Sequence, residues 1–203
     1  KQKKKYVNSS ILFNIFGALL AAQNQLNNAI ESYQKAIKIN PSYAQAYNNL
    51  GVALQKLNKP DDAILRYNKA INLKNDFPEA YLNLGNAYLE LNNPENSIKY
   101  FTKALSIKPG FADAYNNLGA TYEKIGKKNE AIENYQKSIK AKPDFTDAYN
   151  NLGTLFSDVA QFDESMLNYK KAIDLNPNNE KYYNNLGTLL NTLGKYDEAD
   201  NYL

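Results

Sequence analysis

Apolar residues along this chain recur at helical spacing in short stretches, and a residue that breaks or ends helices follows each stretch. Between residues 44 and 57, Tyr47, Leu50, Gly51 and Leu54 fall on one face of a helix turning about 100° per residue. The stretch that follows each such segment has the same period. The pattern therefore predicts pairs of short amphipathic helices along the whole chain.

The helix pairs form an internal repeat of 34 residues. Glycines recur at 17, 51, 85, 119, 153 and 187, and each step between them is 34 residues. Counting the glycine as position 8 divides the chain into five full units and a partial sixth: 10–43, 44–77, 78–111, 112–145, 146–179 and 180–203. Each unit is expected to cover its apolar face with its neighbour, as repeat arrays do.

Prolines and turn residues mark the predicted helix ends. Four of the seven prolines follow second helices, and the other three stand where a first helical turn tolerates a missing N–H. The turn inside a repeat calls for a left-handed residue that closes the preceding helix. Asn58, Asn92, Gly126 and Gly194 stand at that point.

The repeated phrase Ala-Tyr-Asn-Asn-Leu-Gly, seen at 46–51, 114–119 and 148–153, resembles the tetratricopeptide repeat family. The family pattern has aromatics at positions 4 and 24, Leu at 7, Gly at 8, Ala at 20 and 27, and Pro at 32. Mild departures occur at Ser97, Ser138, Ser165 and Asn75. The resemblance implies an all-α fold, a right-handed superhelix of five full repeats and a partial sixth, whose first helices line a concave groove.

A basic leader, residues 1–9, precedes the repeats and supplies the net charge of +3 through Lys1, Lys3, Lys4 and Lys5. The lysines and the apolar run 11–22 imitate a signal peptide. Gly17 lies in register with every later repeat glycine, which favours a first repeat helix instead. The run is too short to span a bilayer, and the repeats carry no net basic excess, so neither a membrane nor a nucleic acid is an expected partner.

Cysteine and histidine are both absent, which removes thiolate nucleophiles, imidazole bases and the commonest transition-metal ligands. Paired carboxylates such as Asp61 and Asp62 stand at a predicted helix start, where they complement the helix dipole. We therefore expect no enzyme activity, no metal site and no cofactor. A cytoplasmic location is expected, although a cysteine-free protein is equally suited to the periplasm.

The most regular polar feature is asparagine at two adjacent positions of the first helices, on the face opposite the predicted core. Position 6 holds Asn49, Asn83, Asn117, Asn151 and Asn185, and position 5 holds Asn14, Asn48, Asn116, Asn150 and Asn184. A carboxamide has both donor and acceptor and can bind an extended peptide backbone. The candidate peptide-binding residues are Asn48, Asn49, Asn83, Asn86, Asn116, Asn117, Asn150, Asn151 and Asn185, with specificity expected from positions 9, 12 and 13.

Two other interpretations of the groove stay open. Asparagine is abundant throughout, so compositional bias could place it at exposed positions, although its uniform use at position 6 goes against its low helix propensity. The carboxylate clamp that some family members use is matched only by Asn86 at position 9 and Asn117 at position 6.

The predicted function is a protein-interaction scaffold that binds an extended peptide through this asparagine ladder. The ladder is similar to that of the helical arm of O-linked N-acetylglucosamine transferases. One alternative is therefore the substrate-recognition arm of a larger glycosyltransferase whose catalytic domain lies beyond residue 203. Another is a self-assembling scaffold that associates through exposed ends, since Ile11, Ile15, Ala21 and Ala22 make the groove side of the first helix apolar.

Overall fold

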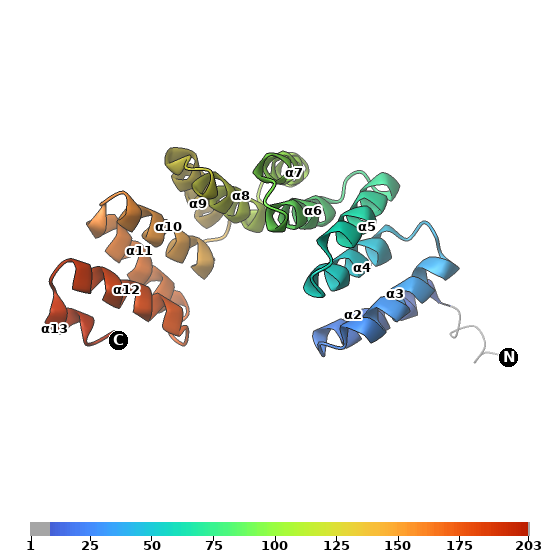
Figure 1. Ribbon diagram of the computed structural model, residues 1–203, viewed down its shortest axis with the longest axis horizontal. Coiled ribbons are helices and arrows are strands. Elements are labelled where there is room, and N and C mark those ends of the chain that lie inside the picture. Colours follow the sequence, from blue (N-terminus) through green and yellow to red (C-terminus); the bar gives the residue numbers. More distant parts are fainter. Residues whose placement is uncertain (1–8, 203) are drawn as a thin grey trace. The chain divides into compact units, whose positions relative to one another are not determined.

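The computed structural model describes residues 9–202, and every regular element in that range is a helix. Figure 1 shows helices joined by short turns in succession. The first helices of the repeats are α2 Ser10–Ala22, α4 Ala44–Lys56, α6 Pro78–Glu90, α8 Ala112–Lys124, α10 Thr146–Asp158 and α12 Glu180–Thr192. The second helices are α3 Leu26–Ile39, α5 Pro60–Leu73, α7 Pro94–Ile107, α9 Lys128–Ala141, α11 Phe162–Leu175 and α13 Tyr196–Ala199. The predicted all-α repeat fold is confirmed.

The turn inside each repeat uses a left-handed residue, as the sequence predicts. The backbone φ is 58° at Asn58, 55° at Asn92, 77° at Gly126 and 73° at Gly194. The corresponding residues of the first and fifth repeats are Asn24 and Ala160, both with φ 59°. Alanine is the unusual choice, because its Cβ crowds the following carbonyl in this conformation.

The described chain divides into two compact units, the first ending at Pro109 and the second beginning at Gly110. In the first unit α3 packs on α4 and α5 packs on α6, and in the second unit α9 packs on α10 and α11 packs on α12. First helices of successive repeats also contact each other, α2 with α4 and α4 with α6, and α8 with α10 and α10 with α12. We call the side of each unit formed by these helices the first-helix surface. A single solenoid over 10–203 stays a prediction, and residues 1–8 of the basic leader lie outside the described residues.

The repeat glycine and the aromatic residue at position 24 make the core contact within a repeat. A Cβ added to Gly51 would lie 2.5 Å from Tyr67 Cε1, and one added to Gly119 would lie 2.8 Å from Tyr135 Cδ1. The position-24 rings from Tyr33 to Tyr169 are buried, as predicted. Glycine is therefore needed at position 8 because the ring of the second helix occupies the space where a side chain would start.

The three serines that depart from the alanine pattern are buried and hydrogen-bonded. Ser97 Oγ donates to the Asn93 carbonyl at 3.0 Å, Ser138 Oγ to the Ala112 carbonyl at 2.9 Å, and Ser165 Oγ to the Gly153 carbonyl at 2.7 Å. Each hydroxyl thus has a backbone acceptor, which removes the penalty of burying it.

The surface of the first helix, α2, is unusually apolar. Positions 3, 7 and 10 of the later first helices are buried residues, such as Ala46, Leu50 and Ala53 of α4. The same positions of α2 are Leu12, Phe16 and Leu19, which are 44%, 55% and 58% exposed. In α4 this face is the one on which the preceding second helix packs. α2 therefore exposes an apolar face, whereas the equivalent face of each later first helix is buried.

Candidate functional site

The asparagine ladder is a set of hydrogen bonds between successive repeats. In each bonded pair, the position-6 asparagine donates its side-chain N–H to the side-chain oxygen of the position-5 asparagine in the preceding repeat. The Nδ2–Oδ1 distances are 3.0 Å for Asn49 to Asn14, 3.0 Å for Asn83 to Asn48, 3.1 Å for Asn151 to Asn116, and 2.8 Å for Asn185 to Asn150. The two predicted rows are thus linked in pairs between successive repeats within each unit.

Position 5 is not on the surface, and this part of the sequence prediction is wrong. Asn14, Asn48, Asn116 and Asn150 are all buried. The helical wheel treats a helix as isolated, whereas in the structure the next first helix covers the flank that carries position 5. Asn184 of α12 is exposed. Where a following first helix is present, a position-5 asparagine cannot contact a peptide directly but can orient the amide bonded to it.

The position-6 asparagines lie half-buried on the first-helix surface. Asn49 Oδ1 accepts a hydrogen bond from Gln45 Nε2 at 3.0 Å. Within residues 9–202, no protein group donates a hydrogen bond to the Oδ1 atoms of Asn83, Asn151 and Asn185. Among the fully buried side-chain nitrogen and oxygen atoms of that range, only Arg66 Nε has no hydrogen-bond partner. These three oxygens therefore reach solvent. Each such amide is held by one bond and keeps an acceptor open.

Asn86 and Asn117, the two residues that match part of a carboxylate clamp, are half-buried. Asn117 Oδ1 accepts from Asn116 Nδ2 at 3.3 Å. Position 5 of the third repeat is Leu82, which has no amide to act as an acceptor. The bonded ladder pairs therefore occur as two in the first unit and two in the second.

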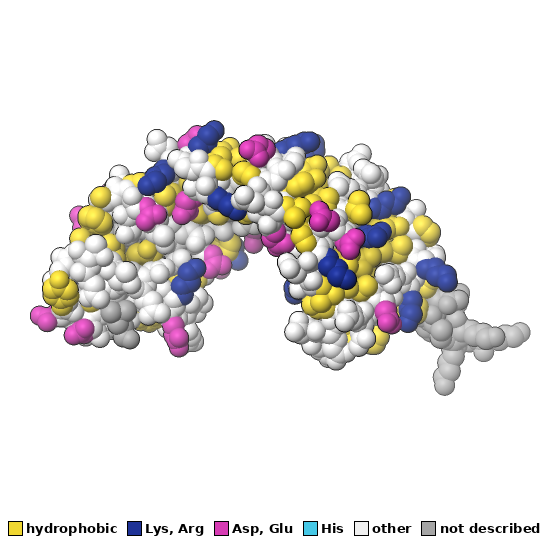
Figure 2. All heavy atoms as spheres, viewed as in Figure 1, with side chains coloured by type: hydrophobic (Ala, Val, Ile, Leu, Met, Phe, Trp, Pro, Cys, Tyr) yellow, Lys and Arg dark blue, Asp and Glu magenta, His cyan; other side chains and the backbone are white. Residues whose placement is uncertain are grey.

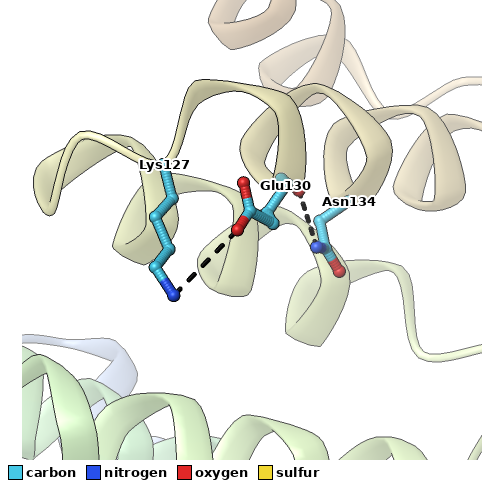
Figure 3. Close-up of polar contacts among 3 residues, drawn as sticks. All are labelled: Lys127, Glu130 and Asn134. Carbon is cyan, nitrogen blue, oxygen red and sulfur yellow. Dashed lines mark hydrogen bonds and ion pairs between the residues drawn. The ribbon is translucent and has the colours of Figure 1, made fainter.

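Asparagines on the second helices behave differently. Figure 3 shows Asn134, whose Nδ2 donates to the carbonyl of Glu130 at 2.8 Å, while the Glu130 carboxylate pairs with Lys127 Nζ at 4.0 Å. Asn168 makes the same bond to the Glu164 carbonyl, also at 2.8 Å. These amides bond within their own helix and link no repeats. The regular use of asparagine at positions 5 and 6 thus has a structural cause, the inter-repeat bond, besides composition or a ligand.

A second polar pattern, which the sequence analysis missed, joins position 24 to the first helix of the same repeat. Tyr67 Oη donates to Gln55 Oε1 at 2.7 Å, and Tyr135 Oη donates to Glu123 Oε2 at 2.6 Å. Burial raises the pKa of both tyrosines, so both hydroxyls stay protonated and act as donors. Gln55 and Glu123 occupy position 12, so the signal was a pairing of residue types 12 positions apart.

The first repeat breaks this pairing. Position 12 is Ala21, and no group in the described range accepts a bond from the Tyr33 hydroxyl. A pocket of about 230 Å³ lies there between α2 and α4, and Tyr33, Asn49 and Lys56 are among the residues that line it. Burial raises the pKa of Tyr33, so its hydroxyl also stays protonated.

Among the described residues, the structure shows neither a candidate metal site nor a helix that could span a membrane. The part of the chain that the structure describes holds no cluster of three or more acidic or histidine side chains suited to a metal ion. None of its helices is both long and apolar enough to cross a membrane. On the face drawn in Figure 2, acidic and basic side chains are interspersed.

Sequence profiles of known families match the repeats throughout the chain. Profiles described as "TPR repeat" match residues 17–58 and 56–92, and profiles described as "Tetratricopeptide repeat" match residues 78–111, 112–145, 146–179 and 168–201. A search of curated proteins by sequence found no match.

Several solved structures are similar to this chain. A crystal structure of MamA is 30% identical, with a TM-score of 0.68, and the match covers 78% of this chain and 93% of MamA. PilW, described as a type IV pilus biogenesis factor, is 23% identical with a TM-score of 0.86, over 95% of this chain and 90% of its own. YrrB, described as a TPR protein with an unusual peptide-binding site, is 22% identical with a TM-score of 0.64, over 88% and 92%. The repeat pattern, the helix pairs and these matches establish that the chain belongs to the tetratricopeptide repeat family.

Proposed function

We propose that this protein is an interaction scaffold that binds an extended peptide on its first-helix surface through the position-6 asparagines. The proposal assigns no catalytic step to these residues. The observation that carries it is the open Oδ1 of Asn83, Asn151 and Asn185, each on an amide already fixed by a bond to a buried neighbour. A fixed acceptor can bind a peptide N–H without losing further side-chain freedom.

The role of position 5 changes under this proposal. Asn48 and Asn150 accept the bonds that orient Asn83 and Asn185, so they act as positioning residues. This arrangement gives the ladder two tasks, holding successive repeats in register and presenting one open amide oxygen in three of the four bonded pairs.

The expected affinity of the ladder alone is low. A hydrogen bond contributes about 0.5–1.5 kcal/mol net, so even the two open amides of the second unit supply only roughly 2 kcal/mol to one peptide. That is less than the 4.1 kcal/mol that corresponds to a Kd of about 1 mM. A physiological ligand therefore needs side-chain contacts as well as backbone bonds.

The proposal is tested by panning the purified protein against a library of extended peptides. Wild type is compared with a variant that carries Asn83→Ala, Asn151→Ala and Asn185→Ala. We expect the selected peptides to bind wild type and to lose most of their affinity for the variant.

The matched control is Ser97→Ala, Ser138→Ala and Ser165→Ala, which also removes three hydrogen bonds but on the second helices. This control should bind peptides as wild type does, although its Tm falls. Equal loss in both variants would assign the effect to stability, and undiminished binding by the asparagine variant would refute the ladder as the site.

The exposed face of α2 supports a second candidate function, self-association. The later first helices bury the corresponding residues under a preceding second helix. α2 has no charged residue, and Ile15 takes the place of the position-6 asparagine that links repeats. A second copy of α2 offers a matching apolar face and brings no like charges together, so we propose that two chains pair through α2.

Sedimentation velocity over a range of concentrations tests this pairing. Wild type should show a concentration-dependent dimer, and Phe16→Glu should remain a monomer. Leu167→Glu is the control, because Leu167 is 70% exposed on α11 and should leave the dimer intact. A monomeric wild type at all concentrations would eliminate this candidate.

A further inference from the structure

The pocket at the start of the first-helix surface lies where one internal hydrogen-bond partner is missing. Gln55 and Glu123 at position 12 each accept a bond from the position-24 tyrosine of their own repeat. In the fifth repeat the acceptor is Thr154 Oγ1, to which Tyr169 Oη donates at 3.1 Å. The third repeat has no hydroxyl to satisfy, since its position 24 is Phe101 and its position 12 is Leu89.

Only Tyr33, among the position-24 tyrosines that the structure describes, is left without an acceptor. Tyr33 is 3% exposed, but its hydroxyl is not among the fully buried atoms that lack a partner. Because Tyr33 lines the pocket, the hydroxyl reaches solvent there. A buried donor without a partner costs about 1–3 kcal/mol unless water or a ligand supplies an acceptor.

Most of the side chains that line the pocket are small and apolar. Ala18, Ala21, Ala22, Val52 and Ala53 line it together with the three polar residues Tyr33, Asn49 and Lys56. Its volume of about 230 Å³ far exceeds the roughly 30 Å³ share of one water molecule. A side chain with a short aliphatic stem and a polar end therefore fits better than water alone.

The second repeat shows what kind of polar end is required. Gln55 accepts from Tyr67 Oη and donates its Nε2 to Glu90 Oε1 at 2.6 Å, so a carboxamide lies between one donor and one acceptor. Glu90 is position 13 of the next repeat, and the corresponding residue at the first-repeat pocket is Lys56. The residues that line the pocket thus bring two donor groups, the Tyr33 hydroxyl and the Lys56 ammonium. Two donors, one of them cationic, are complementary to a carboxylate.

We propose that this pocket binds a carboxylate carried by the peptide that occupies the first-helix surface. The inference rests on the proposed peptide-binding function and adds a specificity pocket to it. No aspartate or glutamate lines the pocket, so none opposes the incoming charge. The carboxylate could belong to a glutamate side chain or to the C-terminus of the peptide, and both sources are tested. The residues differ from those of a carboxylate clamp, which uses first-helix positions alone.

The test uses three nine-residue peptides with one alanine- and serine-based sequence. The first is acetylated and amidated, the second is identical except for a central glutamate, and the third has no glutamate but a free C-terminal carboxylate. Kd values are measured by NMR titration at low salt for wild type, Tyr33→Phe, Lys56→Ala and Ala21→Glu. Tm is measured for each protein.

We expect at least one carboxylate peptide to bind wild type at least about tenfold more tightly than the uncharged host. Tyr33→Phe should abolish most of that gain at unchanged Tm, because the hydroxyl has no internal partner and Phe101 shows that a phenyl ring fits position 24. Lys56→Ala should also reduce the gain. Ala21→Glu supplies the carboxylate from within the chain, so it should abolish the gain and raise Tm by about 2–4 °C.

Each failure has a different meaning. If the host binds and neither carboxylate peptide binds more tightly, or if the gain survives both Tyr33→Phe and Lys56→Ala, the pocket is not a carboxylate site. If no peptide binds, the pocket is decided by Tm, because the alanine- and serine-based host lacks the side-chain contacts that the proposed function requires, and panning decides that function separately. In that case the Tm of Ala21→Glu must be higher than that of Ala21→Leu, a control that fills the pocket without a carboxylate. An equal or lower Tm for Ala21→Glu overturns the inference.

Discussion

The bond between Asn185 and Asn150 allows the structural role of the ladder to be measured. Asn150 is 2% exposed, and its Oδ1 lies 2.8 Å from Asn185 Nδ2. Asn185→Ala leaves a buried acceptor without a donor, which costs about 1–3 kcal/mol. Asn150→Ala instead frees a half-buried donor that can turn to water, but it also leaves a small cavity. Both variants should therefore lower the free energy of unfolding, for different reasons.

The direct interaction is isolated by a double-mutant cycle in urea denaturation. The two substitutions together should cost less than the sum of the single ones, with a coupling energy of about 0.5–1.5 kcal/mol. Asn184→Ala is the control, because Asn184 occupies the same repeat position as Asn150 but is exposed. Alanine also has a higher helix propensity than asparagine, so the substitution itself does not weaken the helix. It should change stability by less than about 0.5 kcal/mol. A coupling energy of zero, or an equal loss for Asn184→Ala, would refute the inter-repeat bond.

Three further predictions concern the core, a turn and the tyrosines. Gly119→Ala should lower stability by about 1–2 kcal/mol in chemical denaturation, because overpacking against Tyr135 outweighs the gain in helix propensity, whereas Gly110→Ala, with no heavy atom within 4 Å, should not. Ala160→Gly should raise stability by about 0.5–1 kcal/mol, because it relieves the left-handed alanine, and Gly126→Ala should lower it similarly; the opposite signs would disprove the strain. Burial raises the pKa of Tyr135 and of other position-24 tyrosines in the folded protein. Above about pH 10 these tyrosines therefore ionise in the unfolded chain before they ionise in the folded one, so Tm should fall there. A constant Tm through pH 11 would contradict this.

Features set by one residue or by a fixed period were predictable from the sequence. The glycine period locates the first helices, and the asparagines and glycines of the turns, such as Asn58 and Gly126, have the positive φ that they were expected to have. The turn residues reflect a steric limit on φ at that residue, and the repeat glycine reflects the space that the position-24 ring occupies. The helix pairs and the buried position-24 rings follow from the same period.

Features that depend on the neighbouring repeat were not predictable in the same way. The burial of Asn116 and Asn150 requires the packing of the next first helix, which the periodicity of one helix does not contain. The pocket at Tyr33 depends on Ala21, on its own repeat, and on Lys56 in the next one. A comparison of positions 12 and 24 across repeats would have singled out Ala21, because Gln55 and Glu123 each stand opposite a tyrosine.

Backbone recognition by the fixed amides of the first-helix surface is tested with N-methylated peptides. A peptide selected on wild type is resynthesised with one backbone N–H at a time replaced by N-methyl, and each Kd is measured. N-methylation removes the donor that an open asparagine oxygen would accept and leaves every side chain in place. We expect N-methylation at several positions to weaken binding about three- to tenfold, and we expect no such effect in the variant lacking Asn83, Asn151 and Asn185. Equal affinity for every N-methylated peptide would contradict backbone recognition.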